Sequence, residues 1–220
     1  MLFFIRNLSS AGVETKQIIV IAIAYLLVIV LSLSLHEFAH AYAAFKSGDP
    51  TPKIRGRITL NPVKHIDLIG FICCMLFGFG WAKPVEICPN NFRNIKKGVG
   101  WTSVAGVLMN LTLAFVGCGF FALVSSIGAA NILAVFFEQF FYYLFIVNIS
   151  LAVFNFLPIY PLDGFKFVEN YTKYNNGYVQ FMHRYGSIIL IALVVFFDSL
   201  LLTLINYIAY PIMWFWNLIF

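Results

Sequence analysis

Long uncharged stretches, separated by short polar loops, make up most of the chain. Residues 18–35 carry no charge, and residues 101–137 carry none either. Apolar stretches of this length are typical of helices that cross a bilayer. We predict one span at residues 17–45 and two more within residues 101–157, separated by a polar turn at residues 125–131.

The helical pattern is less clear in four further regions. Residues 66–82 are apolar and rich in glycine, but this length is borderline for a span, so a re-entrant segment is the rival interpretation. Residues 53–60 partly alternate polar with apolar positions, which predicts a short strand, and residues 83–88 could form a second one. The tail at residues 186–220 holds either one span or a tight pair of spans.

Composition indicates the class of protein. Of 220 residues, 61% are hydrophobic and only 10% are charged, which is typical of a polytopic membrane protein. The longest polar stretch, residues 46–64, is too short to bury a core of its own, so we expect a single membrane-embedded domain over residues 1–220. The net charge is +5, and the basic residues lie in short loops between apolar stretches. Their distribution therefore indicates the topology in the membrane and not nucleic-acid binding.

The expected fold is therefore an all-α polytopic membrane protein. Its core would be three transmembrane helices plus a re-entrant segment with short β-strands. One or two extra C-terminal helices would follow this core.

An HExxH motif, His36-Glu37-Phe38-Ala39-His40, lies at the end of the first apolar stretch. Positions i and i+4 share one face of a helix, so His36 and His40 can hold one metal ion while Glu37 reaches a water molecule on it. In soluble helices, two surface histidines with satisfied hydrogen bonds beside a glutamate are a common alternative. Three ionisable groups at a membrane span are costly unless they have a function. The motif and its setting therefore favour a metal site, and hydrolysis by zinc.

Two other classes of protein are compatible with such a cluster. A metal or ion transporter could use the same histidine and acidic side chains as a transit site. A carrier should show ionisable residues along a path across the membrane, often with repeated halves. Here these residues gather near one depth and no internal repeat appears. A catalytically inactive scaffold is the third class, and the intact HExxH motif argues against it.

Five motifs follow one another along the chain: HEFAH at residues 36–40, NPVKHIDLIG at 61–70, GFGWAKPV at 78–85, AGVLMN at 105–110 and NFLPIYPLDG at 155–164. Together they resemble the successive signatures of the site-2 protease family of intramembrane zinc metalloproteases. The resemblance covers about residues 33–168, and the tail lies outside it. Several motifs in the right order are far more specific than HExxH alone.

The resemblance implies roles for five residues. His36, His40 and Asp163 would bind one Zn²⁺ ion. Glu37 would be the catalytic base, and the amide of Asn110 could donate a hydrogen bond to the developing oxyanion. The substrates would be transmembrane proteins, either membrane-anchored regulators or leftover signal peptides.

The resemblance also implies where a substrate binds. At a few positions, however, this sequence departs from the family pattern. Residues 53–60 and 78–87 would receive the substrate as an extended strand. Val107 stands where the family usually has proline, and Phe165 and Lys166 stand where glycine and arginine are common. None of these departures removes a catalytic group.

The assignment of Asp163 depends on the topology of residues 66–82. If that segment crosses the membrane, His40 and Asp163 lie on opposite sides, too far apart for ligands that each approach zinc to about 2 Å. If the segment is re-entrant, both residues face the same side. Pro158 and Pro161 would then end the preceding helix and turn Asp163 towards the histidines.

Charge favours the re-entrant alternative. One side then collects twelve of the 14 basic residues, against Arg6 and Lys16 on the other, whereas a spanning segment gives nine against five. The positive-inside rule places the basic side in the cytoplasm. We therefore expect a multi-pass protein in the lipid bilayer of a prokaryotic plasma membrane, with its site open towards the cytoplasm. The sequence does not specify the substrate or the oligomeric state.

Overall fold

The structure, a computed structural model, describes residues 14–77, 80–128, 131–173 and 175–220. Five of the described helices are long and apolar enough to cross a membrane: α2 (Thr15–Lys46), α5 (Ile95–Ile127), α6 (Ile132–Phe156), α8 (Gly177–Phe196) and α9 (Asp198–Asn217). The shorter elements are the α-helices α3 (Thr51–Ile54), α4 (Leu68–Phe77) and α7 (Asp163–Tyr171), and the 3₁₀ helices η1 (Pro62–Lys64) and η2 (Pro89–Asn91). The prediction of a helical multi-pass membrane protein is confirmed.

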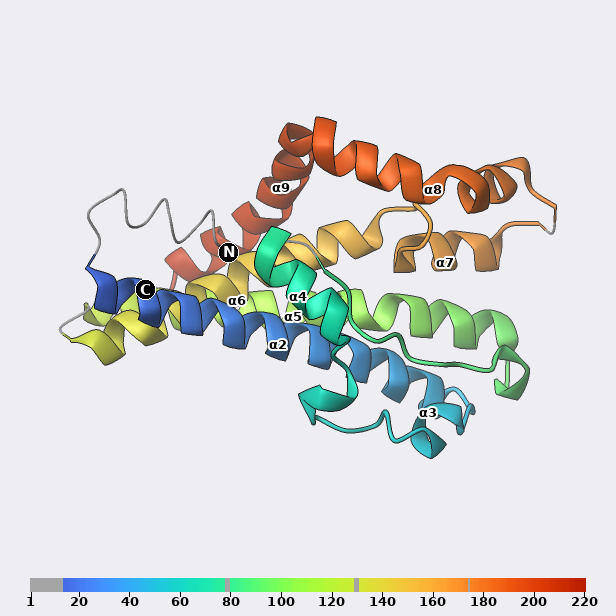
Figure 1. Ribbon diagram of the computed structural model, residues 1–220, viewed down its shortest axis with the longest axis horizontal. Helices are drawn as coiled ribbons and strands as arrows, with labels where there is room; N and C mark the ends of the chain where they lie inside the picture. Colours follow the sequence, from blue (N-terminus) through green and yellow to red (C-terminus); the bar gives the residue numbers. More distant parts are fainter. Residues whose placement is uncertain (1–13, 78–79, 129–130, 174) are drawn as a thin grey trace.

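Helices α2, α5 and α6 lie lengthwise against one another and form the core (Figure 1). They correspond to the three predicted spans. Helices α5 and α6 form an antiparallel hairpin that turns at Gly128, whose φ of +82° is a conformation that favours glycine. Gly117 lets these two helices approach closely, because a Cβ there would lie 2.9 Å from the backbone nitrogen of Phe145.

A buried polar contact fixes α2 against α6. The Nδ2 of Asn148 donates a hydrogen bond to Ser32 Oγ at 2.8 Å, and both side chains are fully buried. In a bilayer no water competes for such a bond, so it helps to set the register of the two helices. Ser32 precedes His36 by one turn on the same face of α2. The contact therefore directs the face that carries the histidines into the bundle.

The chain leaves α2 and enters α5 at the same end of the bundle. The backbone N–H of Arg93 donates to the carbonyl of Ser47 at 3.0 Å, so the loop between the two helices begins and ends together. Within this loop, the two ends of residues 66–82 also meet, because Ile66 and Ala82 form an antiparallel bridge. Helix α4 lies between these ends. The two ends of this segment therefore lie side by side.

The strand predicted at residues 53–60 is wrong, because its first residues belong to helix α3. Asp49 Oδ1 accepts the first N–H of α3 at 3.0 Å, and Pro52 supplies a helical φ within the first turn. The chain then turns at Gly56, whose φ is +65°. The alternation of polar and apolar residues here reflects a capped helical turn and a loop.

Residues 83–88, here called the strap, are extended but pair with no second strand in the described ranges. Two buried charged side chains hold the ends of the strap instead. At one end, the guanidinium of Arg57 donates to the first two strap carbonyls, at 3.5 and 3.3 Å. At the other end, Asp49 Oδ2 accepts the N–H of Cys88 at 2.7 Å. The N–H of Lys83 also donates to the carbonyl of His65 at 2.7 Å. The strap is thus fixed mainly by side chains and not by a sheet.

The tail forms two helices, α8 and α9, which meet at a break at Phe197. Helix α9 packs on the α5–α6 hairpin: Ala209 joins the buried cluster there, and Trp216 Nε1 donates to the carbonyl of Phe115 at 2.9 Å. Helix α8 stands apart from this core (Figure 1), and of its described residues only Gly186 is buried. The tail therefore ends in two helices of span length, which corresponds to the alternative of a pair of spans.

Asp49 is an ionised side chain inside the loop. It also accepts hydrogen bonds from Asn91 Nδ2 at 2.9 Å and Thr51 Oγ1 at 2.6 Å. Burial would raise the pKa of Asp49, but the hydrogen bonds from Asn91, Cys88 and Thr51 outweigh it and hold the pKa below its ordinary value. The stability that Asp49 contributes is therefore present above the ordinary carboxyl pKa. It is lost as the pH falls through the lowered pKa.

Asp49→Ala should release the strap, because it removes the acceptor of four partly buried hydrogen bonds, at a cost of about 2–3 kcal/mol. At neutral pH, hydrogen exchange should show the protection of the Cys88 amide falling by about 30-fold or more. Glu86→Ala is the matched control, since Glu86 is an exposed acid of the same strap that pairs with Arg55 at the surface. Unchanged protection in Asp49→Ala, or an equal loss in the control, would contradict this account of the loop.

Candidate metal centre

Three side chains that can bind a metal ion meet between α2, α5 and α7. His36 Nε2 and His40 Nε2 are 3.0 Å apart, one turn apart on the same face of α2. Asp163, the first residue of α7, places its Oδ2 3.2 Å from His36 Nε2 and 2.9 Å from His40 Nε2. All three residues are buried. The fold thus brings together the three ligands that the sequence predicts.

Hydrogen bonds on the far side of each ring decide where its proton lies. His36 Nδ1 donates to Asn110 Oδ1 at 2.7 Å, and His40 Nδ1 donates to the carbonyl oxygen of Thr102 at 2.6 Å. Both partners are acceptors, so the neutral rings present Nε2 lone pairs to each other and to Asp163. Three buried acceptors at this spacing need a cation between them.

The spacing and the space at this point fit a metal ion. Ligands about 2.0–2.1 Å from a tetrahedral zinc ion lie about 3.3 Å from one another, close to the 2.9–3.2 Å found here. Gly106 of α5 faces the same point, because a Cβ there would lie 2.4 Å from His40 Nε2 and 2.7 Å from His36 Nδ1. The absence of a side chain at Gly106 leaves room beside the ligand atoms.

The chain reaches Asp163 through a sharp reversal after α6. Helix α6 ends at Phe156, two residues before Pro158, as the sequence predicts. Gly164 packs against this last turn of α6, since a Cβ there would lie 2.2 Å from the carbonyl oxygen of Phe156. Lys166 Nζ pairs with the second carboxylate oxygen of Asp163, Oδ1, at 2.9 Å.

Asp163 is ionised despite its burial. Lys166 Nζ lies 2.9 Å from its Oδ1, and this charge-assisted contact is the one that an ionised carboxylate makes. A charged carboxylate at this depth is costly unless cations lie beside it. The charge of Asp163 is therefore a second argument for a cation at the cluster.

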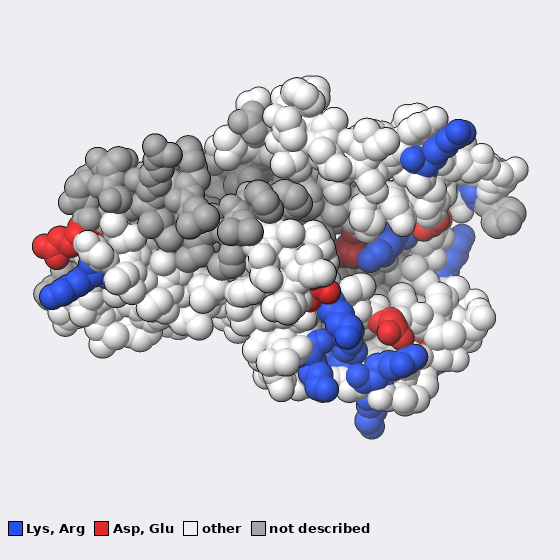
Figure 2. Space-filling view, viewed as in Figure 1, with Lys and Arg blue, Asp and Glu red and all other residues white. Residues whose placement is uncertain are grey.

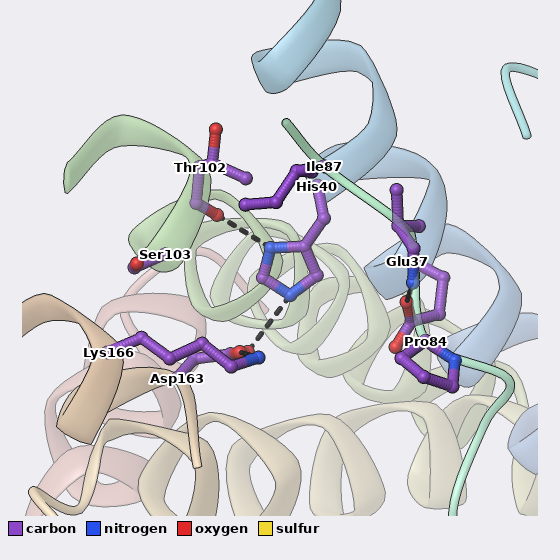
Figure 3. Close-up of a pocket in the computed structure, with 9 residues that line it drawn as sticks. Glu37, His40, Pro84, Ile87, Thr102, Ser103, Asp163 and Lys166 are labelled. Carbon is purple, nitrogen blue, oxygen red and sulfur yellow. Dashed lines mark hydrogen bonds and ion pairs between the residues drawn. The ribbon is translucent and has the colours of Figure 1, made fainter. Parts of the chain in front are cut away.

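Glu37 and Pro84 of the strap lie on one side of His40, and Asp163 and Lys166 lie on the other (Figure 3). Oε2 of Glu37 accepts the N–H of Val85 in the strap at 3.2 Å. The cavity between these groups has a volume of about 70 Å³. Such a space holds several water molecules. It is lined by Glu37, His40, Pro84, Val85, Ile87, Thr102, Ser103, Asp163 and Lys166.

Asn110 lies behind the ring of His36 and is not among the residues that line the cavity. Its Nδ2, the atom that would contact an oxyanion, is buried and has no hydrogen-bond partner among the described residues. The sequence reasoning missed Thr102 and Gly106. Their signal is a four-residue spacing with Asn110, which places all three on the face of α5 that meets His36 and His40.

Two other histidines lie outside the cluster. His65 Nε2 contacts the carbonyl oxygen of Thr59 at 2.8 Å inside the loop, and His183 pairs with Glu169 at 2.6 Å. Neither residue is a predicted ligand. Within the described residues, the cluster of His36, His40 and Asp163 is the group suited to a metal ion.

Comparison with known proteins agrees with this site. A sequence model of the family described as "Peptidase family M50" matches residues 123–197. The protein of Bacillus subtilis (strain 168) named "Putative zinc metalloprotease YwhC" is 41% identical over 145 residues, which are 64% of this chain and 66% of that protein. No solved structure matches the chain.

More distant relatives come from mycobacteria and share the name "Putative zinc metalloprotease Rip2". The Mycolicibacterium smegmatis protein is 30% identical over 148 residues, 63% of this chain and 53% of that protein. The Mycobacterium tuberculosis (strain ATCC 25618 / H37Rv) protein is 30% identical over 169 residues, 73% of this chain and 62% of that protein. The chain thus spans just under two thirds of the length of the Bacillus relative and less of the mycobacterial ones. The serial motifs, the family match and these relatives all point to peptidase family M50, the site-2 protease family, as the family that this chain resembles.

Proposed function

We propose that the protein is a zinc-dependent intramembrane endopeptidase that cleaves peptide bonds in or near the transmembrane segments of membrane proteins. The observation that carries this proposal is the buried cluster of His36, His40 and Asp163, with Glu37 at the same cavity. His36 lies ten residues inside the end of α2, a depth of about 15 Å. The names of the relatives indicate the same metal and the same class of reaction.

The three ligands would hold one Zn²⁺ ion and leave a fourth position open. Zinc bound there would supply an acidified water molecule and polarise the scissile carbonyl. Asn110 and Thr102 prepare the ligands, because they hold the Nδ1 protons of His36 and His40 and so leave both Nε2 atoms free to bind.

Glu37 would move the proton. Its carboxylate would take a proton from the attacking water molecule and later pass it to the leaving amine. The N–H of Val85 holds Oε2, which orients the carboxylate. Oε1 has no hydrogen-bond partner in the described part of the chain, so it is available to accept the proton.

Asn110 has two proposed uses, one for each amide atom. Its Oδ1 orients His36. Its Nδ2, which is unpartnered among the described residues, could donate to the oxyanion, as the family resemblance implies. The position of Asn110 behind His36 favours the orienting use.

A substrate would bind as an extended strand along the strap. The cavity is small, about 70 Å³, so a bound peptide would need the strap to shift or would add along the edge of the strap. The backbone groups of Glu86 and Ile87 have no backbone partners within the described ranges, and a peptide could pair with them. A transmembrane helix hides its carbonyls in its own hydrogen bonds. Such pairing would therefore stabilise the unwound form that cleavage needs.

The site is proposed to open towards the cytoplasm of a prokaryotic cell, with residues 66–82 entering the bilayer without crossing it. The bridge between Ile66 and Ala82 supports a re-entrant path. Figure 2 shows Lys and Arg side chains gathered around the end of the molecule that carries α3, with few at the opposite end. The positive-inside rule favours a cytoplasmic location for that end. The named relatives are bacterial.

A transporter is less well supported than a protease. A carrier needs a series of sites along its path. In the described part of the chain, the candidate ligands form one cluster at one depth. The family and the names of the relatives also favour a protease.

Glu37→Gln should lower the rate of cleavage of a transmembrane substrate by about 100-fold or more, because it removes the proton acceptor and spares the metal ligands. The measurement is turnover by purified protein in liposomes, with zinc content determined in parallel and expected to be unchanged. Glu138→Gln, which changes an acid of α6 outside the cavity, is the matched control. Wild-type turnover by Glu37→Gln would contradict the proposed mechanism.

Asp163→Ala should lose most of its zinc, with an affinity about 100-fold weaker or worse, since it removes a direct ligand and not merely a supporting contact. Zinc per chain is measured after purification and dialysis against a weak chelator. His65→Ala and His183→Ala should keep wild-type zinc. Full occupancy in Asp163→Ala, with loss in either histidine control, would overturn the ligand assignment.

A further inference from the structure

We propose that Lys166 is a positioning residue that holds Asp163 as a one-oxygen metal ligand. The two carboxylate oxygens of Asp163 divide their contacts. Oδ2 faces the two histidines, at 3.2 and 2.9 Å, whereas Oδ1 is 2.9 Å from Lys166 Nζ. The inference rests on the proposed function for its zinc ion, and it adds a task for a side chain that the motifs do not assign.

Helix α7 fixes the geometry of this pair. Asp163 and Lys166 are its first and fourth residues, and positions i and i+3 lie on the same face of a helix. The Asp163 side chain is 7% exposed, and that of Lys166 is 54% exposed. The lysine therefore reaches inward from the surface and places its cation at the rim of the cavity. In the described part of the chain, Asp163 is its only ionic partner.

The division of contacts matters because a carboxylate can bind a metal ion through one oxygen or through both. Two-oxygen binding by Asp163 would fill the fourth position, which hydrolysis needs for water. With Lys166 on Oδ1, that oxygen would have to give up a charge-assisted hydrogen bond in order to turn towards the metal. Lys166 thus keeps the fourth position open, and a neutral side chain of similar size cannot do so.

Cobalt substitution tests this inference, because the visible absorption of Co²⁺ reports its coordination geometry. The full-length protein is purified, freed of zinc and loaded with Co²⁺. The wild type should show the intense absorption of a four-coordinate ion. Lys166→Met should show the weaker absorption of a five-coordinate ion, a decrease of about twofold or more per bound ion. Lys166→Arg, which keeps the cation, should match the wild type.

Lys173→Met is the matched control, since it removes an exposed lysine just beyond α7, and its spectrum should be that of the wild type. An unchanged spectrum in Lys166→Met would overturn the inference but leave the proposed function intact, because Glu37→Gln tests that function separately. The melting temperature of the metal-free protein shows whether Lys166 only stabilises the fold. Equal losses of absorbance and melting temperature in both Lys166→Met and Lys166→Arg would also contradict the inference.

Discussion

Three buried lone pairs facing one point are the constraint on which the rest of this structure depends. Two histidine Nε2 atoms and one carboxylate oxygen lie within 3.2 Å of one another. Asn110 and Thr102 accept the Nδ1 protons, so neither ring can turn a proton inward without losing a hydrogen bond. The atoms repel one another unless a cation lies among them. Each core helix serves this arrangement: α2 supplies the histidines, α5 the acceptors and the space at Gly106, and the turn after α6 supplies Asp163.

The sequence predicted which residues come together at the cluster better than it predicted the loop around it, and the reason is the range of the interactions. The spacing of His36 and His40, and the prolines that end α6 before Asp163, are local signals within a few residues. Asp49, in contrast, binds partners 39 and 42 positions later in the chain. No local pattern reports such contacts. The alternation at residues 53–60 therefore predicts a strand, although Asp49 makes its first residues helical.

The same long-range contacts connect the loop to the chemistry. Asp49 and Arg57 fix the two ends of the strap, and the strap in turn places the N–H of Val85 on Glu37. The position of the proposed base thus depends on buried charges outside the bundle. Four-residue spacing on α5 was a signal for Thr102 and Gly106 that could have been used. It becomes informative only when α5 is known to face α2.

The central claim is that two histidines and one aspartate hold zinc and leave one position for water. X-ray absorption at the zinc edge of the purified, zinc-loaded protein tests it most directly. The account predicts four light neighbours at about 2.0–2.1 Å, with the outer-shell scattering of two imidazole rings and no sulfur. A third imidazole, which would implicate His65 or His183, or a sulfur neighbour near 2.3 Å would contradict it.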